Sequence, residues 1–239
     1  MKKRHSLARL PLLTIGFILF TGVLFTACKK SNDNSGNNTP VAGLMAFNLA
    51  PDKPSIGISL SGSNLTQTPL AYAGFTGSYL PIYTGSRNVA SFDNNSTPLS
   101  SDSITFEANK YYSLFVVGIN GSYKNLIVND NFDSLSSTSD QAFIRYINAI
   151  PDSSKPSVNI TAGGNSIINS SAGFPAVSAF VPVTAGDVNV ALTNESTINL
   201  NRTITLEQKK IYTILLIGNP AATDSTAKPQ IRFIQNGSL

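Results

Sequence analysis

The side chains that could carry out chemistry are few in this chain of 239 residues. The single His, His5, lies near the N-terminus, and the single Cys, Cys28, follows the same N-terminal region. Beyond residue 28 no Ser-His-Asp or Cys-His arrangement and no zinc site of the His/Cys type can form. A disulfide within the chain is excluded because it needs two cysteines. Carboxylate pairs, Ser-Lys dyads and Tyr acids are the chemistries that remain.

Two aspartates stand in turns of matching sequence, Pro51-Asp52 and Pro151-Asp152. Calcium takes about six to eight oxygen ligands, usually with several carboxylates close together. Each aspartate is the only acidic residue near its turn, which does not meet that need. Asp side chains commonly bond the backbone of their own turn. We therefore expect Asp52 and Asp152 to cap their turns, and we expect no metal and no cofactor.

Two glutamates also stand at matching positions, Glu107 and Glu207, and lysines follow each of them. A glycoside hydrolase would need a second carboxylate about 5–10 Å away, and the matching stretches supply none. We expect exposed turn charges at these positions. A carboxylate-based glycan hydrolase is an alternative that requires two other acids to face one cleft. The candidates are Asp93 or Asp102 with Asp187 or Glu195.

Tyrosine is distributed unevenly along the chain. Six tyrosines lie between residues 41 and 132, namely Tyr72, Tyr79, Tyr83, Tyr111, Tyr112 and Tyr123, against Tyr146 and Tyr212 later on. Such rings could form a ligand platform, for instance for a sugar. Trp, the usual centre of such a platform, is absent from the sequence. We therefore expect core and rim packing to account for most of these rings.

The charges limit the partners that the protein can have. The net charge is +4, but four of the 17 basic residues lie in the first nine positions and no acidic residue precedes Asp33. From Cys28 onward the remaining 13 basic side chains balance the 13 acidic ones. The basic residues of this part are scattered, without a stripe of Lys and Arg. This distribution argues against a nucleic-acid partner.

Residues 1–27 have the layout of a secretory signal peptide. The basic start is followed by an uncharged, mostly apolar stretch from Leu10 to Phe25 and then by the small residues Thr26 and Ala27. An uncleaved transmembrane anchor is the alternative. The apolar stretch is about 16 residues long, which is short for the ~20 that span a bilayer. We therefore expect the leader to be removed.

The segment Leu24-Phe25-Thr26-Ala27-Cys28 resembles a bacterial lipobox. In that family of signals, cleavage occurs before the cysteine and the thiol receives a diacylglycerol. The resemblance implies lipidation of Cys28, which also explains why a secreted chain keeps one unpaired cysteine. Attached acyl chains would anchor the protein to a membrane without a transmembrane helix.

Residues 28–40 show no apolar periodicity, which is typical of a flexible tether. The Cys-Lys-Lys start followed by Ser, Asn and Gly resembles lipoproteins of the Bacteroidetes. Surface-exported members of that group often carry an acidic cluster just after the cysteine, whereas this chain has only Asp33. The resemblance implies an outer-membrane lipoprotein and leaves open whether it faces the periplasm or the cell surface.

Three short segments resemble the O-glycan acceptor sites of exported Bacteroidetes proteins: Asp102-Ser103-Ile104, Asp133-Ser134-Leu135 and Asp224-Ser225-Thr226. The pattern is short enough to occur by chance. O-glycosylation is therefore a hypothesis, and an intact mass of the native protein equal to polypeptide plus lipid would contradict it.

The elements that must position these residues repeat along the chain. From about residue 41 the sequence aligns with itself at an offset near 100. Asn48–Asp52 matches Asn148–Asp152, Tyr79–Gly85 matches Phe180–Gly186, and Tyr112–Gly118 matches Tyr212–Gly218. Each unit of roughly 95 residues is a comfortable size for one domain. The predicted organisation is a first domain over 41–132, a polar linker over 133–140 and a second domain over 141–239.

Within each unit, apolar residues alternate with polar ones, as in Ile56, Ile58 and Leu60. This period of two predicts half-buried strands, and the runs 112–117 and 212–217, apolar on both faces, fit central strands. About seven such runs per unit are separated by turns rich in Gly, Pro and Asn. The pattern predicts an all-β chain of two tandem antiparallel β-sandwich domains of immunoglobulin-like type. A small barrel is the alternative.

The same residues carry a family resemblance. A first strand that ends in Asn-Ala-x-Pro-Asp, a Val-x-Ile strand and a Val-Pro-Val-x-Ala-Gly strand entry resemble the family called domain of unknown function 4397. The second unit is the closer match, since the first has Thr84-Gly85 in place of Ala185-Gly186. The resemblance implies a sandwich fold and an envelope or secreted setting. It implies no agreed activity and no catalytic residues.

Together these observations predict a non-enzymatic, lipid-anchored protein of the cell envelope of a Gram-negative bacterium, with a binding, adhesion or structural role. Its partners would be a membrane, through lipid on Cys28, and a glycan or protein ligand. An accessory glycan-binding lipoprotein of a polysaccharide-uptake system is one alternative, and the carboxylate-based glycan hydrolase is the other.

Overall fold

A computed structural model describes residues 39–136, 140–152, 154–194 and 196–239. The predicted signal peptide over 1–27, the predicted lipidation site Cys28, most of the predicted tether and the candidate acid Glu195 lie outside the described residues. Residues 39–239 form one compact unit. All its regular elements are strands apart from one short 3-10 helix, η1 (Phe132–Ser134), within the described residues.

The first sequence repeat folds into two sheets. The inner sheet has the order β5 (Leu80–Tyr83), β1 (Val41–Asn48), β8 (Tyr111–Ile119) and β9 (Ser122–Asn129). The outer sheet has the order β3 (Ser63–Asn64), β2 (Ser55–Leu60), β6 (Gly85–Asp93) and β7 (Pro98–Phe106), and β4 (Leu70–Ala71) also pairs with β2. Their facing sides enclose a core that includes Leu44, Ile56, Val89 and Leu114.

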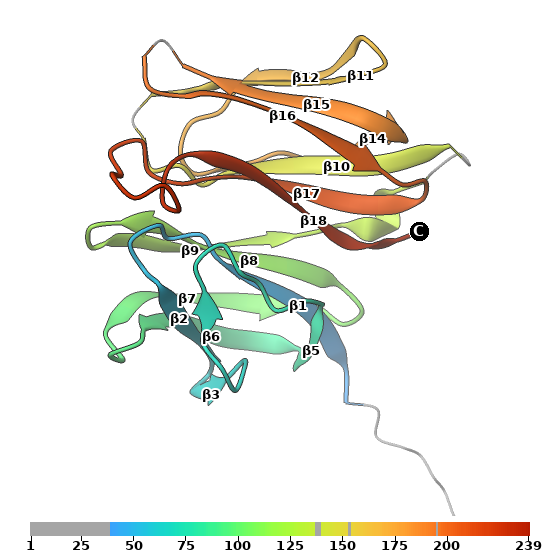
Figure 1. Cartoon of the computed structure of the whole chain (residues 1–239). Coiled ribbons are helices and arrows are strands. Elements are labelled where there is room, and N and C mark those ends of the chain that lie inside the picture. Colours follow the sequence, from blue (N-terminus) through green and yellow to red (C-terminus); the bar gives the residue numbers. More distant parts are fainter. Residues whose placement is uncertain (1–38, 137–139, 153, 195) are drawn as a thin grey trace, which may run out of the picture. The chain divides into compact units, whose positions relative to one another are not determined.

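The second repeat has the same plan. Its inner sheet contains β13 (Ala176–Val177), β14 (Val181–Thr184), β10 (Gln141–Asn148), β17 (Lys210–Ile217) and β18 (Gln230–Ser238). Its outer sheet has the order β12 (Asn165–Ser171), β11 (Ser157–Ala162), β15 (Gly186–Thr193) and β16 (Asn199–Leu206). The four sheets lie in layers, with the two inner sheets in the middle (Figure 1).

The predicted all-β class with sandwich sheets is confirmed, and each described sheet is open rather than closed into the alternative barrel. One pairing in each inner sheet differs from a purely antiparallel plan. Strand β1 runs parallel to β8, and β10 runs parallel to β17. Parallel neighbours need a long crossover, and here the whole outer sheet of each repeat lies between the two paired strands in sequence.

The Asn-x-x-Pro-Asp motif is the exit of the first strand in each repeat. The buried Asn48 side chain donates from Nδ2 to the carbonyl oxygen of Leu70 at 3.1 Å and accepts the N–H of Ala50 at 3.2 Å. The buried Asn148 does the same with Ala172, at 2.8 Å, and with Ile150, at 3.1 Å. An amide side chain can satisfy both kinds of backbone group, so this Asn ends the strand and fixes the turn to the outer sheet.

The central strands of the inner sheets are buried on both faces because the two repeats pack against each other. Their shared core contains, from the first repeat, Met45, Phe47, Leu49, Phe115 and Val117 and, from the second, Ile147, Ala149, Leu215 and Ile217. The side chains of one strand alternate between two faces, so the neighbours of these residues fill the core of each sandwich. The runs that are apolar on both faces in the sequence are these strands.

A buried polar cluster interrupts this shared core. Arg145 on β10 forms an ion pair with Asp130, which follows β9, with Nη1 and Oδ1 2.6 Å apart, and both residues are 2% exposed. Arg145 also donates to Ser113 at 2.7 Å and to Thr213 at 3.0 Å, and its guanidinium lies 4.4 Å from the ring centre of Phe180. The two charges are thus satisfied inside the protein, which burial of charge requires.

The tyrosine Tyr79 completes the cluster. Its hydroxyl donates to Asp130 and accepts from Asn236 Nδ2 at 3.1 Å. Burial, together with the negative charge of Asp130, raises the pKa of Tyr79 well above its usual value. The phenol therefore stays neutral and joins the two repeats by hydrogen bonds.

Candidate functional site

Three of the four highly exposed large hydrophobic side chains among the described residues lie on the first repeat. Among the described residues the large hydrophobic side chains with high exposure are Val41 (41%), Tyr83 (62%), Tyr111 (44%) and Leu239 (44%). Val41 lies opposite Tyr83 in the β1–β5 pairing, and Tyr111 lies opposite Gly43 in the β1–β8 pairing. We call the strip formed by Val41, Pro81, Tyr83 and Tyr111 the tyrosine ledge. A cluster of exposed aromatic and apolar groups is a common mark of a binding surface.

The backbone of Gly43 makes room for this strip. A Cβ atom at position 43 would stand 2.6 Å from Cδ1 of Tyr111 and 3.2 Å from Cβ of Tyr79, so any side chain there would displace the Tyr111 ring. That ring is held in place by the Tyr79 ring, with centroids 5.1 Å apart, and by the Phe132 ring, at 5.4 Å. Tyr111 is therefore a fixed end of the ledge.

A pocket of about 510 Å³ opens beside the ledge, between β5 and the hairpin that joins β2 to β3. We call it the edge pocket. It is lined by Val41, Leu60, Ser61, Ser63, Asn64, Leu65, Pro81, Ile82, Tyr83 and Arg87. A smaller hollow of about 200 Å³ shares Val41 and Pro81 with it and extends along the ledge to Asn109, Lys110 and Tyr111. Ledge and edge pocket together have the size and the mixed lining of a small-ligand site.

The edge pocket lies where one inward-facing position of the first repeat holds a long basic side chain. Residues Arg87, Val89 and Ser91 share one face of β6 by the alternation of strand side chains, and Val89 and Ser91 are buried. Arg87 pairs with Ile104 on β7, and at the matching position of the second repeat Val188 pairs with Ile204. Val188 is 0% exposed and belongs to the core. Where the second repeat closes its sandwich with Val188, the first repeat leaves an opening lined by Arg87.

The edge strand of the outer sheet also differs between the repeats. In the second repeat β12 is seven residues long, and Ile167 and Ile168 pack against the core. In the first repeat β3 has two residues, Leu65 alone of the next five residues packs against the core, and the chain rejoins the sheet at Leu70. Fewer side chains fill this edge of the first sandwich.

The edge pocket carries positive charge and no described negative charge. Arg87 donates from Nε to the carbonyl oxygen of Tyr83 at 3.4 Å and from Nη2 to that of Thr84 at 3.2 Å, and its guanidinium carbon lies 6.0 Å from the centre of the Tyr83 ring. The ion pairs found within the described residues are Lys53–Asp93, Lys110–Asp133 and Arg145–Asp130, so Arg87 pairs with no carboxylate there. These contacts fix Arg87 and leave its charge unbalanced.

The two turn aspartates, Asp52 and Asp152, have different roles. Asp152 caps its own turn, as predicted, by accepting the N–H of Ser154 at 2.9 Å. Asp52 does not follow the prediction, because its Oδ2 accepts the N–H of Asn120 at 3.0 Å and the hydroxyl of Tyr123 at 2.6 Å. It braces the β8–β9 hairpin instead. In the described part of the chain no group of three or more His, Cys, Asp or Glu residues is placed to hold a metal.

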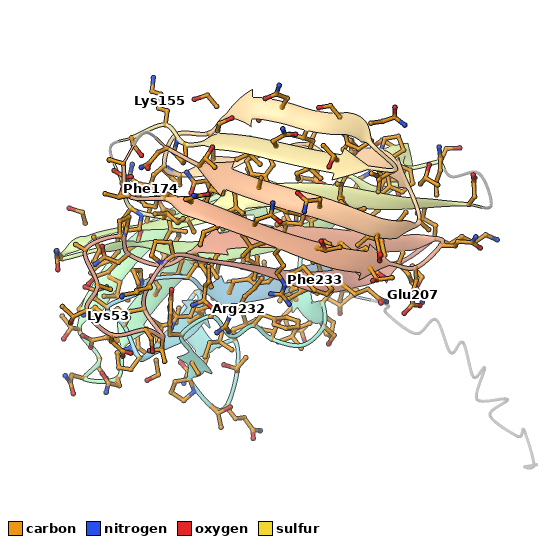
Figure 2. The ribbon with its side chains drawn as sticks, turned by 45° about the horizontal axis from the view of Figure 1, so that its top comes forward. Lys53, Lys155, Phe174, Glu207, Arg232 and Phe233 are labelled. Atoms are coloured by element: carbon orange, nitrogen blue, oxygen red, sulfur yellow. The ribbon has the colours of Figure 1, made fainter. Side chains whose placement is uncertain are left out.

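The two glutamates are exposed, as predicted. Their backbone has the structural role, because the N–H of Glu107 is bound by the hydroxyl of Tyr112 at 3.1 Å and that of Glu207 by Tyr212 at 3.1 Å. Figure 2 shows Glu207 at one end of the strands of the second repeat and Lys155 and Phe174 at the opposite end.

The acids proposed for a hydrolase do not come together. Asp93 and Asp102 lie on β6 and β7 in the outer sheet of the first repeat, and Asp187 lies on β15 in the outer sheet of the second. The two inner sheets lie between them. Among the described candidates, therefore, no pair faces a common cleft, and Glu195 lies outside the described residues.

Sequence reasoning singled out tyrosines as a class but missed Arg87 and the ledge. The signal was present in the alignment of the repeats. Tyr83 matches Thr184 and Arg87 matches Val188, so both positions depart from the repeat pattern. A comparison of non-matching positions, rather than matching ones, would have indicated this site.

Fold and site define a tandem β-sandwich protein with one candidate ligand site. The chain belongs to the family described as domain of unknown function DUF4397, whose model matches residues 42–155 and 142–236. The predicted family and its two tandem copies are confirmed. No curated protein matches the chain significantly. In the part of the chain that the structure describes, no helix is long and apolar enough to cross a membrane.

Several solved structures match the chain at low identity. An α-glucan-binding streptococcal virulence factor is 12% identical, over 77% of this chain and 100% of the other, with a TM-score of 0.22. A putative cell adhesion protein from Bacteroides uniformis is 8% identical, over 82% of this chain and 98% of the other, with a TM-score of 0.24. A leucine-rich repeat protein from Bacteroides thetaiotaomicron is 8% identical, over 75% and 26% of the two chains, with a TM-score of 0.18. Identities and TM-scores this low support no conclusion about fold or function.

Proposed function

We propose that this protein is a non-enzymatic binding protein of the bacterial cell envelope, held at the outer membrane by lipid on Cys28. The observation that supports the binding role is the tyrosine ledge beside the edge pocket. It gathers Val41, Tyr83 and Tyr111 at one place, and these are three of the four large hydrophobic side chains with high exposure in the described part of the chain. Apolar surface in water is unfavourable, so a strip kept exposed on a rigid sheet is best explained by a ligand that covers it.

The lipid anchor is supported by the sequence alone. The lipobox-like segment 24–28 and the polar tether over 28–40 precede the first strand. Labelling of cells with a palmitate analogue should mark the wild-type chain and not a Cys28→Ser variant, and only the wild type should sediment with membranes. Equal labelling of both would refute the anchor. Protease treatment of intact cells would then decide which face of the membrane carries the protein.

The binding role is tested with the purified mature chain, in which Cys28→Ser keeps the protein soluble. Surface plasmon resonance would use immobilised neutral oligosaccharides, acidic oligosaccharides and matrix proteins such as fibronectin as probes. We expect one probe class to be retained by the wild type and lost, at least about tenfold, in Tyr83→Ala. Tyr123→Ala removes a tyrosine that lies outside the ledge and serves as the matched control.

The result that would overturn the binding role is equally concrete. Either no probe is retained, or retention is the same in the wild type, Tyr83→Ala and Tyr111→Ala while all three proteins melt at the same temperature. Both residues are exposed, and truncation of exposed side chains usually changes stability little. A folding failure is therefore not expected to obscure the answer.

A further inference from the structure

We infer that the edge pocket binds an acidic sugar, with the carboxylate of the sugar on Arg87 and a face of its ring on Tyr83. This inference rests on the proposed binding role and names the ligand class. It is drawn from four properties of the edge pocket: its unbalanced charge, its free hydrogen-bonding groups, its exposed ring and its size.

The positive charge of the edge pocket favours an anionic ligand. Among the described residues that line the edge pocket, Arg87 alone is charged, and it pairs with no described carboxylate. Its Nη1 makes no hydrogen bond within the described residues, whereas Nε and Nη2 are turned to the backbone of β5 and the turn after it. A guanidinium fixed in this way presents donors to a ligand, and a carboxylate is the group that matches its planar geometry.

The polar rim of the edge pocket favours a ligand with hydroxyl groups. Ser61, Ser63 and Asn64 line it, and none of the three side chains makes a hydrogen bond within the described residues. Together they offer two hydroxyls and one amide, which can both donate and accept. A lipid tail or an apolar peptide would bury these groups without partners, which is costly, whereas a sugar would satisfy them.

The exposed Tyr83 ring favours a ligand with a flat face that can stack on it. It is 62% exposed and takes part in no ring–ring pair within the described residues. An exposed phenol held near a guanidinium, with 6.0 Å between ring centre and Arg87 Cζ, is a rigid surface with a polar rim. The C–H face of a pyranose fits such a surface and brings its substituents toward Arg87 and Asn64.

The size of the edge pocket sets the length of the ligand. A volume of about 510 Å³ falls in the range of small-ligand sites. It accommodates a short oligosaccharide unit, and the neighbouring hollow toward Tyr111 lets a longer glycan continue over Val41 and Pro81. Lys110, which borders that hollow, is already paired with Asp133 at 2.5 Å, so Arg87 provides the specificity for the acid.

The test compares two probes that differ only at the acid. The matched pair is oligogalacturonate and its methyl-esterified form, each offered to the mature chain with Cys28→Ser. Hyaluronan and sialyl oligosaccharides serve as other carboxylate sugars. Sulfated, carboxyl-reduced glycans serve as an anion without a carboxylate. We expect at least one carboxylate sugar to bind, at least about tenfold more tightly than its ester or reduced form. The affinity should fall with added salt.

Variants assign the effect to Arg87. Arg87→Gln should lose at least about tenfold in affinity for the acidic sugar and lose the salt dependence, and Arg87→Lys should retain part of the affinity because it keeps charge without the planar fork. Arg232→Gln removes an exposed arginine from β18 of the second repeat and is the charge-matched control. Melting temperatures of all variants show whether the fold is intact.

The outcomes separate this inference from the binding role. If acidic and neutral sugars bind equally, or if Arg87→Gln binds as the wild type while Tyr83→Ala does not, the acidic ligand is wrong and the binding role stands. If a matrix protein or a sulfated glycan alone binds through Tyr83, the carboxylate-sugar inference is also wrong. If no probe binds, both proposals fail.

Discussion

The two repeats share one fold and differ at the contact between them and at the edge pocket. The strand exit at Asn48 and Asn148 and the hydroxyl bonds of Tyr112 and Tyr212 are the same in both. The differences fall at a small number of positions. The matching residues build the sandwich, while the non-matching ones form the buried ion pair between the repeats and line the edge pocket.

The first difference between the repeats lies in their shared core. Met45 and Arg145 occupy matching places on β1 and β10, as their pairing with Ser113 and Thr213 shows. Arg145 reaches Asp130 of the other repeat, and Met45 lies 3.9 Å from Asn236 of the other repeat. Ser113 bonds Asp130 as Thr213 bonds Asn236. One half of the contact is thus charged and the other half is neutral.

The largest effect is expected at this contact. Arg145→Met should destabilise the protein by about 3–5 kcal/mol, because it leaves Asp130 charged and buried without its partner. The double variant Arg145→Met with Asp130→Asn copies the neutral half and should recover most of the loss. Urea unfolding of the wild type, both single variants and the double variant measures this coupling. Losses that simply add would show that the two halves are not equivalent.

An intermediate loss of stability, of equal size in the two repeats, is expected when the Asn at either strand exit is replaced. Asn48→Ala and Asn148→Ala should each cost about 1–3 kcal/mol, since each leaves a buried carbonyl group and a buried N–H without the Asn side chain. The free energy of unfolding from denaturant titration checks this. A large loss in one repeat and none in the other would contradict the view that the motif has the same role in both.

A smaller effect is expected at Asp93, present at neutral pH and lost in acid. Asp93 and Asn194 cap matching loops: Asp93 accepts the N–H of Thr97 at 2.9 Å, and Asn194 accepts that of Ile198 at 2.7 Å. The Thr97 N–H foremost, with Lys53 and Asn95, holds the pKa of Asp93 below its usual 3.8. A lowered pKa stabilises the fold above the usual value, and this contribution is lost as the pH falls through the lowered one.

Asp93→Asn should therefore be less stable than the wild type at neutral pH and should approach it below about pH 3.8. Thermal unfolding between pH 2 and pH 7 measures the two curves. Asn194→Ala is the control without a titrating group, and its difference from the wild type should not change with pH. Parallel curves for Asp93→Asn and the wild type would contradict the prediction.

The smallest effect on stability is expected at Arg87, in the proposed ligand site of the first repeat. Arg87→Val gives the first repeat the residue of the second and should change the free energy of unfolding by less than about 1 kcal/mol, because Val suits this inward-facing strand position. It should nevertheless abolish binding to the edge pocket. Calorimetric unfolding and the probe panel check both halves. A strong destabilisation would show that Arg87 is a structural residue.

Much of the fold could be predicted because strand alternation and internal duplication are both visible in one sequence. The direction of β1 relative to β8 could not, since an apolar pattern reads the same in either direction. The contact between the repeats could be predicted only in part from the sequence. The two-sided apolar runs 112–117 and 212–217 indicated full burial, but not that a second repeat provides it. Arg145 and Asp130 are 15 positions apart, and no local pattern marks a charge that folding will bury.

The place of Val41 in the inner sheet has a mechanical consequence. The chain enters the fold at β1, and the tyrosine ledge is built on β1 and its two neighbours, β5 and β8. The proposed ligand contacts this sheet and, through Arg87, also β6 of the outer sheet. A pull between that ligand and the proposed membrane anchor would therefore act on the first repeat and leave the second repeat unloaded. β1 is held by β5 on one side and by β8 on the other, so the load would act along the strand and shear both ladders at once. The first repeat would bear tension, and the second would serve as a rigid backing.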